Sequence, residues 1–354
     1  MLASPGAPER GGERGGPVQP TVTLVVAMRN EARHIDACLR SIVAQDYPPD
    51  RLEILVLDGR STDESRSIAE AALEGRLLAC VLENPDVIQA AAWNRGIEMA
   101  SGDFIGIVSG HATLAPGYVA SAVAALERTG ATMVGGPVHA IGEGVVGTAI
   151  ATASVSPFGV GGARHHYATE AVEVDTVFMG LCRAEDYRRH RFDPRMVRNQ
   201  DDELSYRILD AGGRIVCDPA IQSTYASRSS FGGLVRQQFS YGRWKVLVLR
   251  RHPRQVQVRQ LIPPLFVAAL GGSAGLAILS RRGRRLLGVI VATYGCAAGL
   301  AAIAAPAHTP IKARALLPLV FGAMHIGYGA GILAGLIRLG RETTRGETDP
   351  APPA

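Results

Sequence analysis

Polar residues follow three short apolar runs of the 354-residue chain, where they could bind a ligand rich in hydrogen-bonding groups. The three clusters are Arg29-Asn30-Glu31, Asp58 to Asp63 and Ser109-Gly110-His111. The carboxylate of Asp58 could accept hydrogen bonds from a base or a ribose, and Asp58-Gly59 equally fits a plain tight turn. No G-x-G-x-x-G dinucleotide fingerprint follows the first apolar run, and the chain has no G-x-x-x-x-G-K phosphate loop.

Alternating strands and helices must position these clusters. The predicted strands are Thr21–Met28, Leu52–Leu57, Leu77–Leu82 and Phe104–Val108, and the predicted helices between them are Ile35–Ile42, Ser61–Leu73 and Val87–Ala100. Ser61 or Thr62 is the expected N-cap of the second helix. This alternation predicts right-handed βαβ units and a parallel sheet, with its ligand crevice beyond the carboxyl ends of the strands. All three polar clusters fall at that edge.

Composition and charge narrow the class of protein. Charged residues make up 19% of the chain and hydrophobic residues 47%, with a mean hydropathy of +0.12, which excludes disorder across the whole chain. Much of the net charge of +5 comes from arginines that flank the apolar C-terminal runs. That charge suits anionic lipid and phosphorylated ligands, and no nucleic acid is expected. Five scattered cysteines without a Cys-x-x-Cys pair fit reduced thiols in a cytoplasmic domain.

Three long apolar runs follow residue 260. Leu261–Ser280 and Leu286–Ala305 contain no charged side chain, and the only His, Lys, Arg, Asp or Glu of Ala315–Ile337 is His325. Because about 20 helical residues cover the roughly 30 Å hydrocarbon layer, each run is expected to cross a membrane. Gly-x-x-x-Gly spacings in each run support close helix packing only weakly, since a Gly- and Ala-rich sequence also produces them by chance. Pro263-Pro264 would also suit a re-entrant or interfacial first segment, and arginines on both sides of the first run leave the orientation open.

Six segments of the soluble half carry a more specific signal. In order, they read VVAMRNEARHI, LEILVLDGRSTDES, AAAWNRGIEMASGDFIGIVSGHA, SPFGVGGAR, VDTVFMGLCR and NQDDELSYRI. Residues 21–245 thereby resemble an inverting family-2 glycosyltransferase, in particular the succinoglycan-biosynthesis type of membrane glucosyltransferase. The resemblance implies an α/β GT-A domain, a Rossmann-like nucleotide-diphospho-sugar transferase fold, followed by a C-terminal transmembrane helical segment.

The expected organisation of the chain has five parts. They are a disordered tail over residues 1–20, the GT-A domain over 21–245, a basic interfacial linker over 246–260, about three transmembrane helices over 261–341, and a disordered tail over 342–354. Residues 1–20 lack the apolar core of a signal peptide.

The resemblance implies a nucleotide-sugar donor, with a UDP-sugar as the first choice. It places the nucleoside against Glu31 and Asp58, with Ala27 or Met28 lining the base. Asn94 and Arg95 match the family's A-x-N-x-G-I element, and Ser109 also falls among the donor-binding positions. Arg95 would steady the diphosphate, although a solvated arginine on a helix fits equally well.

The metal motif departs from the family. The family has Asp-x-Asp after the fourth strand, and the subgroup has Asp-x-His, where this chain has Ser109-Gly110-His111. Serine is a weak neutral ligand for a divalent cation, whereas histidine favours Mn²⁺ over Mg²⁺. His111 is the expected metal ligand, and the alternatives are a structural histidine or a metal-independent enzyme in which arginines supply the charge.

A carboxylate must take the proton of the acceptor hydroxyl in inverting transfer. Asn199-Gln200-Asp201-Asp202-Glu203 resembles the family's Glu-Asp motif, which implies Asp201 as the base and Asp202 as the second choice. Acids at a helix start would also stabilise the helix dipole without any catalytic role.

Two further segments are assigned to the acceptor or to a lid. The loop SPFGVGGAR, with Gly159 and Gly161, resembles a subgroup-specific loop that contacts acceptor or diphosphate, and a flexible lid fits it equally. QQFSYGRWK, with Arg243 and Trp244, resembles the loop that closes over related active sites, and an amphipathic interfacial helix is the competing interpretation.

The sequence therefore predicts a multi-pass protein of the cell (inner) membrane with a cytoplasmic catalytic domain. It would move a sugar from the donor to a lipid-linked saccharide, a growing polysaccharide or a polyprenyl phosphate in cell-surface polysaccharide synthesis. The alternative is a catalytically weak or silent scaffold that binds nucleotide sugar in a polysaccharide assembly complex, with Ser109 as its main support.

Overall fold

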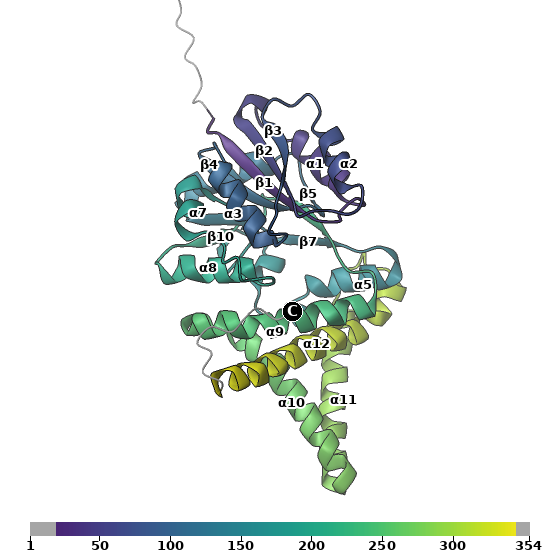
Figure 1. Ribbon diagram of the computed structural model, residues 1–354. Coiled ribbons are helices and arrows are strands. Elements are labelled where there is room, and N and C mark those ends of the chain that lie inside the picture. The colour runs from purple at the N-terminus through teal and green to yellow at the C-terminus, as the bar shows by residue number, and fades with distance from the viewer. Residues whose placement is uncertain (1–18, 345–354) are drawn as a thin grey trace, which may run out of the picture.

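The computed structural model describes residues 19–344, in which two sheets lie above a group of apolar helices (Figure 1). The main sheet contains β1 (Val22–Met28), β2 (Leu52–Asp58), β3 (Ala79–Glu83), β4 (Phe104–Ser109), β6 (Met133–Gly136), β8 (Val172–Glu173), β9 (Phe178–Arg183) and β10 (Ile215–Cys217). Its strand order is β3-β2-β1-β4-β9-β6-β10-β8. A smaller sheet contains β5 (Ala112–Leu114), β7 (Val138–Ile141) and β11 (Ser223–Ala226), in the order β5-β11-β7.

Helices cover both faces of the main sheet. One face carries α1 (Ile35–Val43), α2 (Ser65–Ala72) and α4 (Tyr118–Thr129), and the other carries α3 (Gln89–Met99), α7 (Ala184–His190) and α8 (Gln200–Asp210). Short 3-10 turns occupy η1 (Pro49–Arg51), η2 (Arg164–His166) and η3 (Pro253–Gln255). The seven residues of β1 are all buried, and its alternate side chains join the two opposite cores. This burial on both faces explains the continuous apolar run.

The predicted α/β fold is confirmed, but the sheet contains two antiparallel strands, β8 and β9. β3, β2, β1 and β4 are parallel as predicted, but β9 runs antiparallel to both β4 and β6, so the complete sheet is mixed. Before β9 the chain passes through α5 (Gly144–Ser154) and α6 (Pro157–Val160), which pack with the apolar helices below the sheet. The chain therefore enters β9 from the edge of the sheet at which the parallel strands have their carboxyl ends.

The second helix begins later than predicted because its expected caps are used elsewhere. The backbone N–H and the hydroxyl of Ser61 both donate to the carboxylate of Asp58, and the backbone N–H of Thr62 donates to Asn30. Asp63 accepts hydrogen bonds from Ser65, at which α2 begins. The polar loop after β2 is thus longer than predicted.

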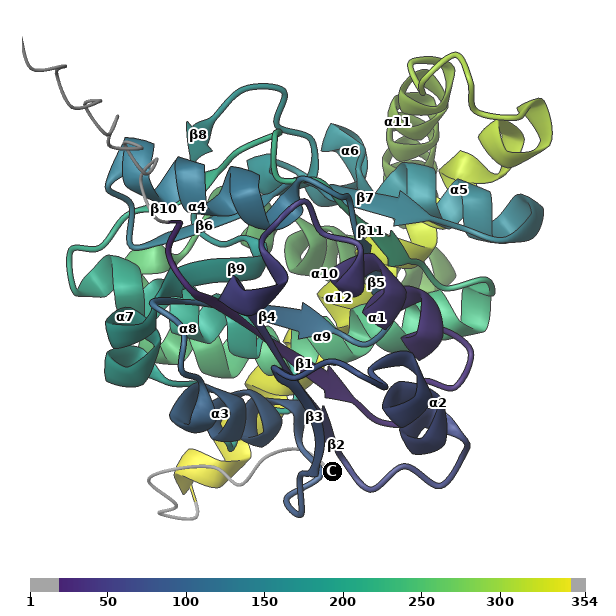
Figure 2. The same ribbon diagram turned by 90° about the horizontal axis from the view of Figure 1, so that it is seen from above.

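Two long helices lie side by side beneath the sheets (Figures 1 and 2). They are α9 (Phe231–Arg251) and α12 (Ile311–Thr344), which pack closely at glycines. A Cβ placed on Gly331 of α12 would lie 2.1 Å from the backbone oxygen of Phe239, and one on Gly242 of α9 would lie 2.1 Å from that of Tyr328. α9 continues through residue 245, at which the expected GT-A domain ends.

Two further apolar helices, α10 (Val258–Leu279) and α11 (Arg281–Ile303), project away from the two sheets (Figure 1). In the described residues, three helices are long and apolar enough to cross a membrane: Val258–Leu279, Arg281–Ile303 and Ile311–Gly340. They correspond to the three predicted runs. A Cβ on Gly271, Gly275, Gly295 or Gly299 would meet open space, whereas Gly327, Gly331 and Gly335 contact α9. The predicted tails lie almost wholly outside the described residues.

Candidate active site

The carboxyl edge of β1, β2 and β4 brings together residues predicted to hold the donor. Because β1 pairs in parallel with both neighbours, Met28 lies opposite Asp58, and Ala27 lies opposite Ser109. Ala27, Asp58 and Ser109 are each less than a tenth exposed, at 7%, 3% and 6%. These side chains therefore form a tightly packed edge.

The loops after β1 and β2 are joined by hydrogen bonds between side chains and backbone. Ser61 Oγ accepts from the backbone N–H of Asn30 at 2.9 Å, and Asn30 Oδ1 accepts from that of Thr62 at 2.8 Å. Asn30 and Arg60 have left-handed φ angles of 53° and 56°. Such conformations are uncommon outside glycine and cluster at functional sites. The two loops thus form one fixed unit.

Asp58 takes part in the tight turn that the sequence suggested. Its Oδ1 accepts from the backbone N–H of Ser61 at 3.0 Å and from the hydroxyl at 2.6 Å. The other oxygen, Oδ2, lies 4.0 Å from the guanidinium of Arg66. The turn therefore uses one carboxylate oxygen and holds the other at the edge of the sheet.

His111 pairs with Glu31. Its Nδ1 lies 2.9 Å from Glu31 Oε1, and its ring meets the Tyr225 ring edge-on with centroids 5.2 Å apart. A carboxylate only accepts hydrogen bonds, so Nδ1 is the donor in this pair and Nε2 is the ring nitrogen that faces other partners. A carboxylate that orients a histidine in this way is the usual support for a histidine metal ligand.

This arrangement fits a cation that takes most of its ligands from the substrate. Residues 19–344 contain no group of three or more His, Cys, Asp or Glu side chains that could hold a metal ion. A divalent ion at His111 would therefore need phosphate oxygens and water as its other ligands. Ser109, two residues before His111, contributes no charge to such a site.

Asp201 lies in the first turn of α8. The N-cap Asn199 has a left-handed φ of 56°, and its side-chain amide donates to the backbone oxygen of Tyr241 at 2.9 Å, which fixes the helix start to α9. Asp201 Oδ1 accepts from the backbone N–H of Asp202 at 3.0 Å. Desolvation, followed by the negative charge of Asp202, raises the pKa of Asp201 to about 6. A carboxylate with this pKa is a better proton acceptor near neutral pH than an ordinary aspartate.

This pKa leads to a prediction for pH dependence. A base works only when it is deprotonated, so kcat/KM for sugar transfer should rise with pH and level off above about pH 6. The measurement is the initial rate of donor turnover from pH 4.5 to 8.5 at constant ionic strength. An acid limb of kcat/KM with its midpoint near pH 4 would instead indicate that the base is an ordinary, solvated carboxylate.

One face of α9 connects the His111 region to the start of α8. Gln237, Tyr241 and Lys245 are four residues apart and therefore share a helix face. Gln237 Nε2 donates to the hydroxyls of Tyr225 and Tyr241 at 3.3 and 3.2 Å, and Lys245 Nζ lies 2.5 Å from Asp202 Oδ2. This connection was not predicted, although the four-residue spacing of Gln237, Tyr241 and Lys245 is visible in the sequence.

The match to a family decides the class of the domain. Residues 23–189 match the model described as Glycosyl transferase family 2. The chain carries a family 2 glycosyltransferase domain. This confirms the resemblance and the enzyme class that the sequence implied.

Two curated relatives are also similar over much of their length. The succinoglycan biosynthesis protein ExoA of Rhizobium meliloti (strain 1021) is 29% identical over 312 residues, 87% of this chain and 92% of ExoA. A dolichyl N-acetyl-alpha-D-glucosaminyl phosphate 3-beta-D-2,3-diacetamido-2,3-dideoxy-beta-D-glucuronosyltransferase of Methanococcus voltae is 27% identical over 239 residues, 65% of this chain and 74% of that enzyme.

A solved structure agrees with the glycosyltransferase fold. The mannosyltransferase PcManGT from Pyrobaculum calidifontis, in complex with GDP-Man and Mn²⁺, matches with a TM-score of 0.56 and 21% identity, and the match covers 90% of this chain and 88% of that one. At this level of identity the likeness shows the GT-A fold.

Within the glycosyltransferase domain, Asn94 and Arg95 differ in their surroundings. The Asn94 amide donates to the backbone oxygen of Phe192 and accepts from its N–H, both at 2.8 Å. Arg95 is exposed on α3. The Asn94 side chain thus supports the loop before α8, and Arg95 remains accessible.

The glycine-rich segment lies against the apolar C-terminal helices. Ser156 caps α6, and Phe158 packs against Phe321 of α12. A Cβ on Gly159 would lie 2.1 Å from the backbone oxygen of Ala153, and one on Gly161, whose φ is +62°, would lie 2.9 Å from Arg259 Cβ. Close approach of the Ala153 backbone accounts for Gly159, and the positive φ together with the contact to the Arg259 side chain accounts for Gly161.

Arg243 and Trp244 lie within α9 and not on a loop. Trp244 is 3% exposed and packs with Met196, Tyr206 and Val248, whereas Arg243 is half-buried beside Gly331 of α12. The segment QQFSYGRWK is therefore helical, as the second of its two interpretations required.

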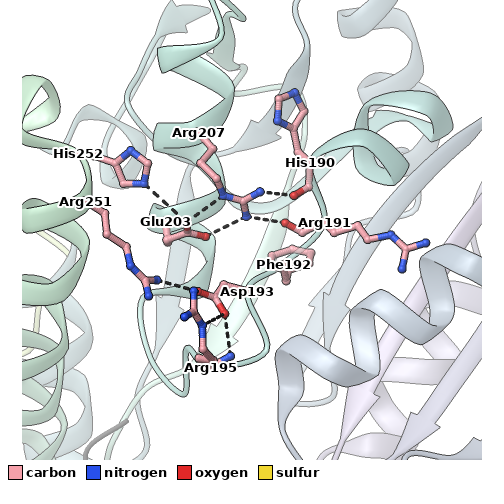
Figure 3. A pocket seen from close by; sticks show the side chains of 9 residues that line it. All are labelled: His190, Arg191, Phe192, Asp193, Arg195, Glu203, Arg207, Arg251 and His252. Carbon is pink, nitrogen blue, oxygen red and sulfur yellow. Dashed lines mark hydrogen bonds and ion pairs between the residues drawn. The ribbon is translucent and has the colours of Figure 1, made fainter. Parts of the chain in front are cut away.

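A pocket of about 340 Å³ is lined by none of the predicted site residues (Figure 3). Its lining residues are His190, Arg191, Phe192, Asp193, Arg195, Glu203, Arg207, Arg251 and His252. Ion pairs cross it, among them Arg207 with Glu203 at 2.8 Å and Arg251 with Asp193 at 2.7 Å. The pocket is thus a charge-paired contact between α8, the loop before it and the end of α9.

Proposed function

We propose that the chain is a membrane-anchored inverting glycosyltransferase that moves a sugar from a UDP-sugar donor to a lipid-linked saccharide or polyprenyl-phosphate acceptor. The observation that carries this proposal is the position of Asp201, on a helix that lies directly above the apolar helices (Figure 1). A catalytic carboxylate so close to the apolar helices favours an acceptor that is held in the membrane. The similarity to a succinoglycan biosynthesis protein and to a dolichyl-phosphate glycosyltransferase supports the same class of acceptor.

The reaction requires one proton transfer and one substitution. Asp201 accepts the proton of the acceptor hydroxyl while its oxygen attacks the anomeric carbon. The new glycosidic bond forms as the bond to the diphosphate breaks, and the leaving electron pair stays on the nucleoside diphosphate. Attack opposite to the leaving group inverts the anomeric centre.

Asp58, Ala27 and Ser109 line the edge at which the nucleoside would lie, and His111, oriented by Glu31, would hold a divalent cation. When bound, that cation would neutralise the charge that develops on the diphosphate. Arg95, exposed on α3, is the further candidate for the diphosphate.

The His111→Ala variant is expected to need about tenfold more Mn²⁺ for half-maximal turnover, because the protein then offers no ligand at this position. The measurement is donor turnover against Mn²⁺ and Mg²⁺ concentration. His139→Ala, which changes an exposed histidine on β7, is the matched control. An unchanged metal dependence in His111→Ala would assign His111 a structural role.

The proposed orientation is multi-pass in the cell (inner) membrane with the catalytic domain in the cytoplasm. The overall test is turnover of a panel of nucleotide sugars by membranes that contain the full chain, with and without Mn²⁺ or Mg²⁺. Transfer from a UDP-sugar to a lipid-extractable product would support the proposal. Absence of turnover from every donor would favour a scaffold that binds nucleotide sugar, for which Ser109 is the supporting residue.

A further inference from the structure

Lys245 is an unusual cation in this chain. It is one of two lysines in a sequence whose other basic side chains are arginine or histidine, and it is buried at 7% exposure in the middle of α9. Its Nζ lies 2.5 Å from Asp202 Oδ2 and 5.3 Å from the centre of the Tyr206 ring. A buried ammonium requires such a partner, because an unpaired charge away from water is costly.

Charged and titratable groups from several elements surround this pair. They are Asp201 and Tyr206 on α8, Tyr241 on α9, Tyr328 on α12, His165 and His166 on η2, and Arg259 on α10. Arg259 is itself paired with Asp175. Burial lowers the pKa of Lys245, but the Asp202 carboxylate and the neighbouring tyrosines outweigh that effect, so its pKa is raised and it stays charged. Lys245 and Asp202 therefore form a persistent ion pair.

The pairing distinguishes two adjacent carboxylates. Asp202 faces Lys245, while Asp201 is bonded by the backbone N–H of Asp202 at 3.0 Å. Because the negative charge of Asp202 raises the pKa of Asp201, the two carboxylates would compete for a proton unless a cation paired with one of them. The ammonium of Lys245 ends this competition between the two carboxylates because it pairs with Asp202.

We propose that Lys245 is a positioning residue, which pairs with the Asp202 carboxylate and leaves Asp201 as the carboxylate that accepts the acceptor proton. This inference rests on the proposed role of Asp201. Since α9 is set against α12 at Gly242 and Gly331, the position of Lys245 depends on a helix of the membrane segment. The membrane helices thereby act on the catalytic carboxylates as well as anchoring the domain.

The test compares Lys245→Met with Lys245→Arg in the full chain, using the pH profile of turnover of the active donor. Loss of the positive charge should move the acid limb of Lys245→Met upward by about one pH unit, which lowers turnover on that limb about tenfold. Lys245→Arg should keep the limb near its wild-type position. Arg236→Met changes an exposed cation on the same helix and should leave the profile unchanged.

The double variant Lys245→Met/Asp202→Asn keeps the test decisive if Lys245→Met does not fold. It removes both charges of the pair, so Asp201 loses its anionic neighbour and the acid limb should return to or below the wild-type position. A limb that stays in place in folded Lys245→Met, or a folded but inactive double variant, would overturn the proposal. Wild-type transfer by Asp201→Asn would instead remove the proposed base, so the two failures are distinguishable.

Discussion

Asp201→Asn is expected to abolish sugar transfer, with kcat about 10³-fold lower, while the nucleotide-sugar donor still binds. Asparagine keeps the size of the side chain but cannot accept the proton of the acceptor hydroxyl. The residues proposed to bind the donor lie at the ends of β1, β2 and β4, on different elements from α8. The measurements are single-turnover transfer and, separately, binding of the nucleoside diphosphate by calorimetry.

The folding stability of the same variant gives an independent control. The pKa of Asp201 is raised from 3.8 to about 6, so ionisation of Asp201 lowers stability as the pH rises through that range. Asparagine removes this cost, and at pH 8 the variant should melt no lower than the wild-type protein. Asp50→Asn, at an exposed acid, should change neither activity nor melting. Transfer near the wild-type rate in Asp201→Asn would exclude Asp201 as the base.

Gly331→Ala is expected to separate α12 from α9 and to lower both thermal stability and transfer. The added Cβ would lie 2.1 Å from the backbone oxygen of Phe239, which cannot move without shifting α9. Overpacking of this kind costs about 1–3 kcal/mol. Because α9 carries Lys245, the displacement should also reach the base. The measurements are the melting temperature in detergent and donor turnover in membranes.

Gly322→Ala on the same helix is the matched control. A Cβ at that position has no atom within 4 Å, so alanine gains helix propensity without a clash, and stability should hold or rise slightly. Equal behaviour of the two variants would show that the α9–α12 contact does not determine stability.

The sequence predicted the elements that depend on local patterns. The continuous burial of β1 and the apolar face of α1, with Ile35, Cys38, Leu39 and Ile42 buried, follow directly from residue type and spacing. The antiparallel β9 could not be predicted in this way, because its direction depends on where α5 and α6 pack. The start of α2 was misplaced because Ser61 bonds Asp58 instead of capping the helix.

The positions of the candidate site residues could be predicted from the sequence, but the contacts between their side chains could not. The sequence located Asp58, Glu31, Ser109 and His111 at the ends of predicted strands, and the strand register brings them to one edge. The pairing of Glu31 with His111 joins residues 80 positions apart, and that of Lys245 with Asp202 joins residues 43 apart. Such contacts arise from tertiary packing, which residue spacing alone does not encode.

The position of α9 between the two parts of the molecule has a consequence for protein engineering. One side of this helix supplies Lys245 to α8, and another supplies the backbone surface on which Gly331 rests. We therefore expect the catalytic domain and the apolar helices to unfold as one cooperative unit. A truncation after residue 257 would uncover α9, and a foreign anchor grafted there would lack the glycines that fit it. This transferase is expected to tolerate neither change, even though both leave its donor-binding edge intact.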